Sequence, residues 1–330
     1  MLYEFGITPD TFDHPNYRTH RQNEVSIIQL LRGVIENGLI ADLHKGRWLE
    51  DVFNSRVSSL SPGLKDKIES CLKILNDRHR LVRHPKCPNN PACDADWFNL
   101  LLESDNKINF YEVITGDDFF LQNDFSDDRF TVLSEILDSV LWLDRRRTLD
   151  LERTETKYRE VFTSVLRHAK TLDIVDPYIN PVDERWTKTI SLLSDLMGKR
   201  HSERLVGRIR IHTNEDQISN SDIDTSPDFH IAQWKSFLEE LNAKDKHGFE
   251  IIYWRVKNRG EQFHDRHIIT NQCGISVPNG LDLPNRVNPG TTDISLLDED
   301  VRLKRLSKFT GSTSVYETKD EWRMKLEPKL

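Results

Sequence analysis

Two strands of one sheet are predicted by TLDIVDPYI at residues 171–179 and VGRIRIHTN at residues 206–214. The first stretch is rich in β-branched and other apolar residues and is ended by Pro177, so it is predicted to be a buried strand. The second alternates apolar and polar residues with a period of two. Helical periodicity lies between the two stretches and on both sides of them. Because helices that alternate with β-branched strands form layered sheets, this half of the chain is predicted to be an α/β domain.

The flanking sequence extends this alternation in both directions. Helices are predicted at 156–169, 184–197 and 230–243, and further strands at 249–256 and 263–270. A glycine-containing stretch, CGISVPNGLDL, follows the last strand. Upstream, RRRTLDLERTET at residues 145–156 is so charged that we expect a helix end or a linker. The predicted domain boundary therefore lies near residue 150, between an N-terminal domain at 1–150 and an α/β domain at 151–330.

The N-terminal half is predicted to be rich in helices. Apolar residues recur at helical spacing from residue 23, again in 58–75, and most strongly in DDRFTVLSEILDSVLWLD at 127–144. The proline-rich stretch at 84–97 breaks this periodicity and is predicted to be a loop. These patterns leave open whether the N-terminal half also contains a small sheet. The fold class expected for the whole chain is α/β, or α+β overall.

Composition indicates a folded, water-soluble protein. The 330 residues are 37% hydrophobic and 30% charged, which suits two domains with cores of their own. Four scattered cysteines indicate a reducing compartment, and neither a secretion signal nor a membrane span is apparent. We therefore expect a cytoplasmic location. The net charge of −8 disfavours binding of nucleic acid except through a local basic patch.

Chemistry is most strongly indicated by FHDRHIITN at residues 263–271. If this stretch is a strand, alternation places His264, Arg266, Ile268 and Thr270 on one face. A guanidinium can hold two phosphoryl oxygens while a neighbouring imidazole attacks phosphorus or transfers a proton. The pair therefore predicts a phosphate site, with no cofactor required.

The spacing of His264, Arg266 and Asn271 resembles the His-x-Lys-x-x-x-x-Asp motif of the phospholipase D superfamily, with Arg for Lys and Asn for Asp. In that family the histidine is the nucleophile, the lysine binds phosphate, and a second histidine protonates the leaving group. The resemblance implies catalytic roles for these three residues. Since the chain has one such motif, it also implies a homodimer. The Asn removes a charge that would orient the histidine.

The same half is more similar to the phospholipase D-like C-terminal domain of proteins that contain a microtubule-interacting-and-trafficking domain. The similarity spans roughly residues 155–310 and is carried by three segments: Asp176-Pro177-Tyr178, His264-Asp265-Arg266 and Gly280-Leu281-Asp282. In that group the domain dimerises and is thought to bind lipids or protein partners without catalysis. The resemblance therefore implies a phospholipase D-like α/β sandwich and leaves catalysis or binding open.

Other polar residues are candidates for supporting roles in this site. Asp176 follows the first strand and either orients a histidine or arginine or caps the turn at Pro177. His212 and Asn214 end the second strand, where open α/β sheets bind ligands, although an exposed loop is the simpler interpretation. The supporting candidates are Asp176, His212, Asn214 and His267.

Metal sites are weaker alternatives. His264, Asp265 and His267 could surround an ion, but the two histidines would point to opposite faces of a strand, so no metal is expected there. Cys87 and Cys93 are separated more widely than usual zinc ligands, and free loop thiols explain them more simply.

A basic cluster lies in the N-terminal half, where Arg78, Arg80 and Arg83 are candidates for nucleic-acid contact. The loose Arg-to-His spacing from Arg78 to His84 is also similar to helical ribonucleases of prokaryotic conflict systems. Tryptophans such as Trp142, Trp186 and Trp234 lie within helical patterns and are more simply explained as core residues than as base-stacking platforms.

Two hypotheses follow for function. The first is a phosphodiesterase, a nuclease of a prokaryotic antiviral defence or mobile-element system, in which His264 attacks and Arg266 holds the phosphate. The second is a non-catalytic module that binds a phosphate-bearing ligand or a protein partner through Arg266. The sequence does not choose among DNA, RNA, lipid or a small phosphodiester, because fold-level similarity does not determine chemistry.

Overall fold

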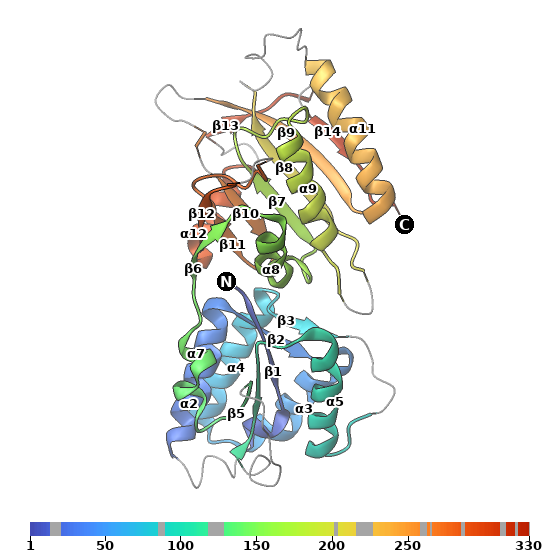
Figure 1. Ribbon diagram of the computed structural model, residues 1–330. Helices are drawn as coiled ribbons and strands as arrows, with labels where there is room; N and C mark the ends of the chain where they lie inside the picture. Colours follow the sequence, from blue (N-terminus) through green and yellow to red (C-terminus); the bar gives the residue numbers. More distant parts are fainter. Residues whose placement is uncertain are drawn as a thin grey trace. The chain divides into compact units, whose positions relative to one another are not determined.

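The computed structural model consists of two compact units (Figure 1). Contacts divide the chain after Arg146, with Met1 joining the C-terminal unit. The described residues are 1–13, 21–84, 90–117, 129–200, 204–215, 227–257, 263–264, 266–284, 288–310, 315–320 and 323–329.

The N-terminal unit is built on a parallel sheet, a feature that the sequence patterns left open. Its strand order is β3-β2-β1-β4-β5, and each neighbouring pair is parallel. The strands are β1 Tyr3–Ile7, β2 Gly38–Asp42, β3 Leu81–Arg83, β4 Glu112–Thr115 and β5 Phe130–Val132. In the described part of this unit, helices lie between consecutive strands from β1 to β4, as parallel pairing requires. The predicted α/β class is therefore confirmed, and the helix-rich N-terminal half also contains its own sheet.

Helices cover both faces of this sheet (Figure 1). The α2 helix, Arg21–Asn37, packs against α4, Pro62–Asp77, while α5, Asp94–Ile108, approaches β1. A Cβ built on Gly6 of β1 would lie 2.2 Å from Leu101 of α5, so glycine permits this close helix–strand contact. The predicted helix at 58–75 is confirmed by α4, with Pro62 in its first turn.

The helix predicted at 127–144 is wrong. Its described part forms β5, then the 3-10 turn Ile136–Asp138 (η5), and then the short α7 helix, Val140–Leu143. Ser139 has extended backbone and accepts a hydrogen bond from the N–H of Trp142, so it starts a new helix at this point. Apolar spacing alone cannot detect such a break.

The C-terminal unit contains a mixed sheet with the order β13-β9-β8-β7-β10-β11-β12-β6, and β14 also pairs with β9. The central strands β7, β8 and β9 are parallel, and β10 runs antiparallel to β7. The bounds are β6 Thr148–Glu152, β7 Thr171–Val175, β8 Arg208–Asn214, β9 Gly248–Val256, β10 His267–Thr270, β11 Gly274–Ser276, β12 Thr291–Leu296, β13 Tyr316–Glu317 and β14 Arg323–Leu326.

The helices predicted in this half are confirmed. They are α8 Glu155–Leu166, α9 Glu184–Leu196 and α11 Pro227–Asp245, followed later by α12 Glu299–Ser307. The α9 helix packs against both α8 and α11. The charged stretch expected to be a helix end or linker instead contributes the strand β6, whose Leu151 is buried. Among the helices that are described, none has the length and apolar character needed to cross a membrane.

Candidate functional site

A cavity of about 380 Å³ lies at the carboxyl end of β7, within the C-terminal unit. Open α/β sheets commonly bind ligands at the carboxyl ends of their parallel strands. The cavity brings together parts of three segments that are distant in sequence. It is lined by Asp176, Tyr178, Asn180, Asp183, Arg185, Trp186, Arg266, Asn279, Gly280 and Asp282.

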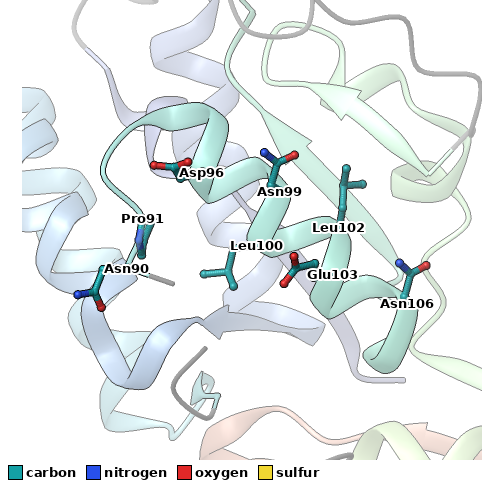
Figure 2. A pocket seen from close by; sticks show the side chains of 8 residues that line it. All are labelled: Asn90, Pro91, Asp96, Asn99, Leu100, Leu102, Glu103 and Asn106. Atoms are coloured by element: carbon teal, nitrogen blue, oxygen red, sulfur yellow. The ribbon is translucent and has the colours of Figure 1, made fainter. Parts of the chain in front are cut away.

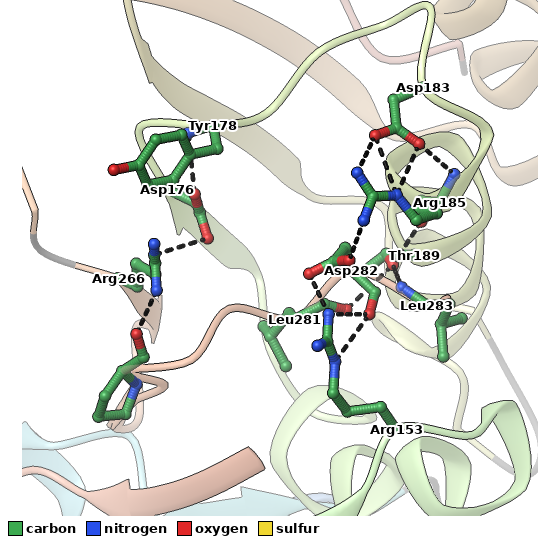
Figure 3. A network of polar contacts seen from close by, with 11 residues as sticks. Arg153, Asp176, Tyr178, Asp183, Arg185, Thr189, Arg266, Leu281, Asp282 and Leu283 are labelled. Atoms are coloured by element: carbon green, nitrogen blue, oxygen red, sulfur yellow. Dashed lines mark hydrogen bonds and ion pairs between the residues drawn. The ribbon is translucent and has the colours of Figure 1, made fainter. Parts of the chain in front are cut away.

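One group of side chains is centred on Arg266 (Figure 3). Antiparallel pairing of β10 with β7 places Arg266, just before β10, close to Asp176, just after β7. The Arg266 Nε lies 3.6 Å from Asp176 Oδ2, and its Nη1 donates to the carbonyl of Pro278. Its guanidinium carbon lies 4.9 Å from the centre of the Tyr178 ring. Arg266 is thus held by an ion pair, a hydrogen bond and a cation–π contact.

A second group lies across the cavity and is centred on Asp282 (Figure 3). Asp282 accepts hydrogen bonds from Arg153 and from Arg185 Nη1, the latter at 3.2 Å. Arg185 also donates from Nη2 to Asp183 at 2.6 Å. Those hydrogen bonds lower the pKa of Asp183 and keep it ionised. The two arginines and the two aspartates therefore balance one another in charge.

Asp176 is a buried titratable group in the cavity. It is only 3% exposed, and burial raises its pKa to about 6 from 3.8. The backbone N–H of Tyr178, which donates to Oδ1 at 2.9 Å, and the nearby Arg266 offset this only in part. Asp282 raises the pKa further because it carries a like charge. Asp176 therefore gains a proton in mildly acidic solution.

The structure separates the three residues predicted to be catalytic. Strand β10 begins at His267, so His264 and Arg266 precede it and do not share a strand face, which corrects the prediction. His264 is exposed and does not line the cavity, whereas Arg266 does. Asn271 follows the other end of β10, where its Oδ1 accepts from the N–H groups of Lys170 and Thr171 at 2.8 and 3.3 Å. Asn271 therefore ties β10 to the start of β7.

His212 is fixed in the core and is 1% exposed. Its Nε2 lies 2.9 Å from Asp173 Oδ1, and its Nδ1 accepts from the indole N–H of Trp254 at 3.0 Å. Burial would raise the pKa of Asp173, but hydrogen bonds from His212 and Arg210 lower it overall. Both ring nitrogens of His212 are therefore engaged away from the cavity, and the supporting role predicted for it is wrong.

The remaining supporting candidates also lie outside the cavity. His267 is buried on β10, opposite Val175, and Asn214 is the last residue of β8. Asp265 is outside the described residues. Of the supporting candidates, Asp176 alone is brought to Arg266.

Several lining residues were missed by the sequence analysis. Arg185 and Asp183 lie at the start of a predicted helix, where nothing in the sequence marks them as site residues. Arg153, which binds Asp282 behind the lining, lies in the charged stretch interpreted as a linker. Asp282, in the Gly-Leu-Asp segment that carries part of the resemblance, was a signal for them, because a carboxylate in a site calls for a cationic partner.

The basic cluster of the N-terminal unit has mainly a structural role. Arg80 is 2% exposed and donates to the carbonyl of Ile35 at 2.9 Å, while Arg78 donates to the same carbonyl at 3.3 Å. These cations stabilise the carboxyl end of α2. Arg83 is exposed, with Asp42 at 3.7 Å. The predicted nucleic-acid contact is therefore wrong for Arg80, which is buried.

A second cavity, of about 420 Å³, lies beside α5 in the N-terminal unit (Figure 2). Its polar lining includes Asn90, Asp96, Asn99, Glu103 and Asn106. Asp96 is occupied by the backbone N–H groups of Ala92 and Cys93, so it caps the helix. Among the described residues that line it there is no arginine, lysine or histidine beside its carboxylates, so the Arg266 cavity is the better candidate site. Cys93 is an exposed free thiol, and Cys87 lies outside the described residues.

Comparisons with known proteins add little. No protein-family model matches the chain, and no curated protein matches it. One solved structure, of the archaeal chromatin protein TrmBL2, is described as showing a novel mode of DNA binding. It is 12% identical, covers 76% of this chain and 80% of its own, and has a TM-score of 0.26. At that score the likeness supports no conclusion about fold or function.

Proposed function

We propose that the C-terminal unit is a binding module for a phosphate-bearing ligand, anchored by Arg266. The observation that carries this proposal is that part of the Arg266 guanidinium has no hydrogen-bond partner among the described residues. Its Nη2 makes no hydrogen bond to any described residue, and its Nε is beyond hydrogen-bonding distance of Asp176. Arg266 nevertheless lines the cavity and is held in place by Tyr178 and Pro278. An arginine oriented in this way is suited to an anionic oxygen.

Binding is favoured over turnover because no histidine is among the described residues that line the cavity. Neither His264 nor His212 lines it, and the acidic side chains on its far wall are already paired with arginines. The proposal includes the resemblance to phospholipase D-like domains that bind ligands or partners without catalysis. A protein partner or a homodimer is compatible with this function but is not required by it.

The test is calorimetric titration of the full chain with ribose 5-phosphate. We expect Arg266→Gln to lower affinity at least about tenfold, since charge-assisted hydrogen bonds contribute about 1.5–3 kcal/mol each. Arg208→Gln is the matched control, because Arg208 is a partly exposed arginine at the opposite end of the parallel strands. Affinity should also fall as salt is added. Equal losses in the two variants, or no binding by the wild type, would refute the proposal.

A histidine-dependent phosphodiesterase, such as a nuclease of a prokaryotic defence system, is the second candidate. It is favoured by one observation, which is that His264 is exposed two residues before Arg266. Labelled single- and double-stranded DNA and RNA would be incubated with wild type and His264→Ala, with and without EDTA. Metal-independent cleavage that is lost in the variant would support this candidate. A dimeric mass of the wild type in solution would support it further, because one motif per chain requires two chains. Absence of cleavage leaves the binding module.

A further inference from the structure

Tyr178 is an exposed aromatic side chain on the wall of the cavity. Its side chain is 45% exposed, although the residues on either side, Pro177 and Ile179, are buried. Large apolar or aromatic side chains that stay exposed in a cavity are candidates for ligand contact. One contact of the ring is already known, since the Arg266 guanidinium lies over it.

The backbone around Tyr178 is held firmly. Asp176 Oδ1 accepts from the Tyr178 N–H at 2.9 Å. The buried hydroxyl of Thr213 is within hydrogen-bonding distance of the carbonyls of Pro177 and Ile179, at 3.3 and 3.1 Å. The segment is therefore fixed on both sides of the exposed ring. A ring positioned in advance loses little conformational freedom when a ligand stacks on it.

Two carboxamides complete the lining. Asn279 is exposed and makes no hydrogen bond to the described residues. Asn180 uses its Oδ1 to accept from the N–H of Val182 at 3.0 Å, which leaves its amide N–H groups as donors. Carboxamides pair with the donor and acceptor groups on the edge of a nucleobase.

The charges of the cavity limit how many phosphates it can accept. Arg266 and Arg185 face Asp176, Asp183 and Asp282. A chain of phosphates would be repelled by the carboxylates, whereas one phosphate can contact Arg266 alone. A volume of about 380 Å³ is within the usual range for small-molecule sites.

From this geometry we infer that the cavity binds a nucleoside monophosphate group, with the base stacked on Tyr178 and the phosphate on Arg266. The inference rests on the proposed function and adds the class of ligand. Asn279 and Asn180 contact the edge of the base. A lipid headgroup would share the phosphate contact but would leave the Tyr178 ring and the carboxamides without a role.

The test compares AMP, GMP, CMP and UMP with ribose 5-phosphate in calorimetric titrations of the full chain. We expect the best nucleotide to bind about tenfold more tightly than the sugar phosphate, the order expected for one stacked base. Tyr178→Leu also removes the ring that holds Arg266, so it should weaken ribose 5-phosphate binding, but it should weaken nucleotide binding about tenfold more and so abolish the advantage. Tyr178→Phe keeps the ring and should retain the advantage. Phe229→Leu is the matched control, because Phe229 is an exposed aromatic residue that does not line the cavity.

The outcomes distinguish base stacking on Tyr178 from phosphate binding by Arg266. Equal affinity for nucleotides and ribose 5-phosphate would overturn the base platform and leave phosphate binding intact. Vesicles with a phosphate-monoester headgroup that compete better than any nucleotide would also overturn it. Failure of every phosphate ligand would refute the proposed function and this inference together. Melting temperatures of the variants confirm that each protein is folded.

Discussion

Asp176 shows how a single buried carboxyl links the site to stability. Its pKa is about 6 in the folded chain and 3.8 in an ordinary environment. Because the folded value is the higher one, the neutral form is favoured by folding. The corresponding stability is fully present below pH 3.8 and is lost as pH rises through 6. At neutral pH the protein therefore holds a carboxylate next to Arg266 at a cost in folding free energy.

We predict that Asp176→Asn stabilises the protein above pH 6. The asparagine keeps an acceptor for the Tyr178 N–H but needs no charge in the interior. A shift from 3.8 to about 6 corresponds to at most about 3 kcal/mol at 1.36 kcal/mol per pKa unit. The gain should appear in urea unfolding at pH 7.5 and fall to about a third of that value at pH 4.5, because the carboxyl is then mostly protonated in the folded chain. Asp183→Asn, whose carboxyl has a lowered pKa, should not stabilise at pH 7.5. A loss of stability in Asp176→Asn at pH 7.5 would contradict this account.

His212 illustrates why residue-level assignment from sequence was limited. The strand that carries it was predicted correctly, and its position near the carboxyl end of the strand was a reasonable signal. Its contacts with Asp173 and Trp254 involve residues far along the chain, and no local pattern reveals them. Pairing of β7 with β10 brings the segments around Asp176 and Arg266 together, and Asp282 from the third matched segment lines the same cavity.

At the level of elements, the C-terminal strands were predictable and the N-terminal strands were not. Strands β7, β8 and β9 are long enough to show an apolar stretch or alternation. In the N-terminal unit, β2 is buried at every position and begins directly after α2, at Gly38. A strand covered on both faces has no period-two signal, and β3 and β5 are shorter still.

Asn271 belongs to this scale, since it joins the ends of two strands. We predict that Asn271→Ala destabilises the protein by about 1–2 kcal/mol, the value of two hydrogen bonds, without changing the affinity for ribose 5-phosphate. Asn271→Asp keeps the acceptor for Lys170 and Thr171 and should be much less destabilising. Urea unfolding and calorimetric titration of both variants provide the measurement. A large loss of ligand affinity in folded Asn271→Ala would show that Asn271 takes part in ligand binding.

At the level of the whole molecule, each unit has an apolar core made from its own residues. One buried cluster runs from Phe5 to Trp142, within the N-terminal unit, and another joins Val175, Trp254 and Phe309 in the C-terminal unit. The predicted boundary near residue 150 lies beside the division after Arg146, but it would cut β6, which starts at Thr148. Strand β6 pairs with β12 and must stay with the C-terminal unit.

Residues 147–330, produced alone, should therefore fold cooperatively and bind ribose 5-phosphate as the full chain does. Every residue that lines the cavity belongs to this unit, so affinity should agree within about threefold, and a single urea transition is expected for a domain of this size. A fragment that starts at residue 153 is the matched control. It lacks β6, exposes the edge of β12 and should be less stable. If the 147–330 fragment folded but failed to bind the ligand bound by the full chain, the N-terminal unit would have to contribute to the site.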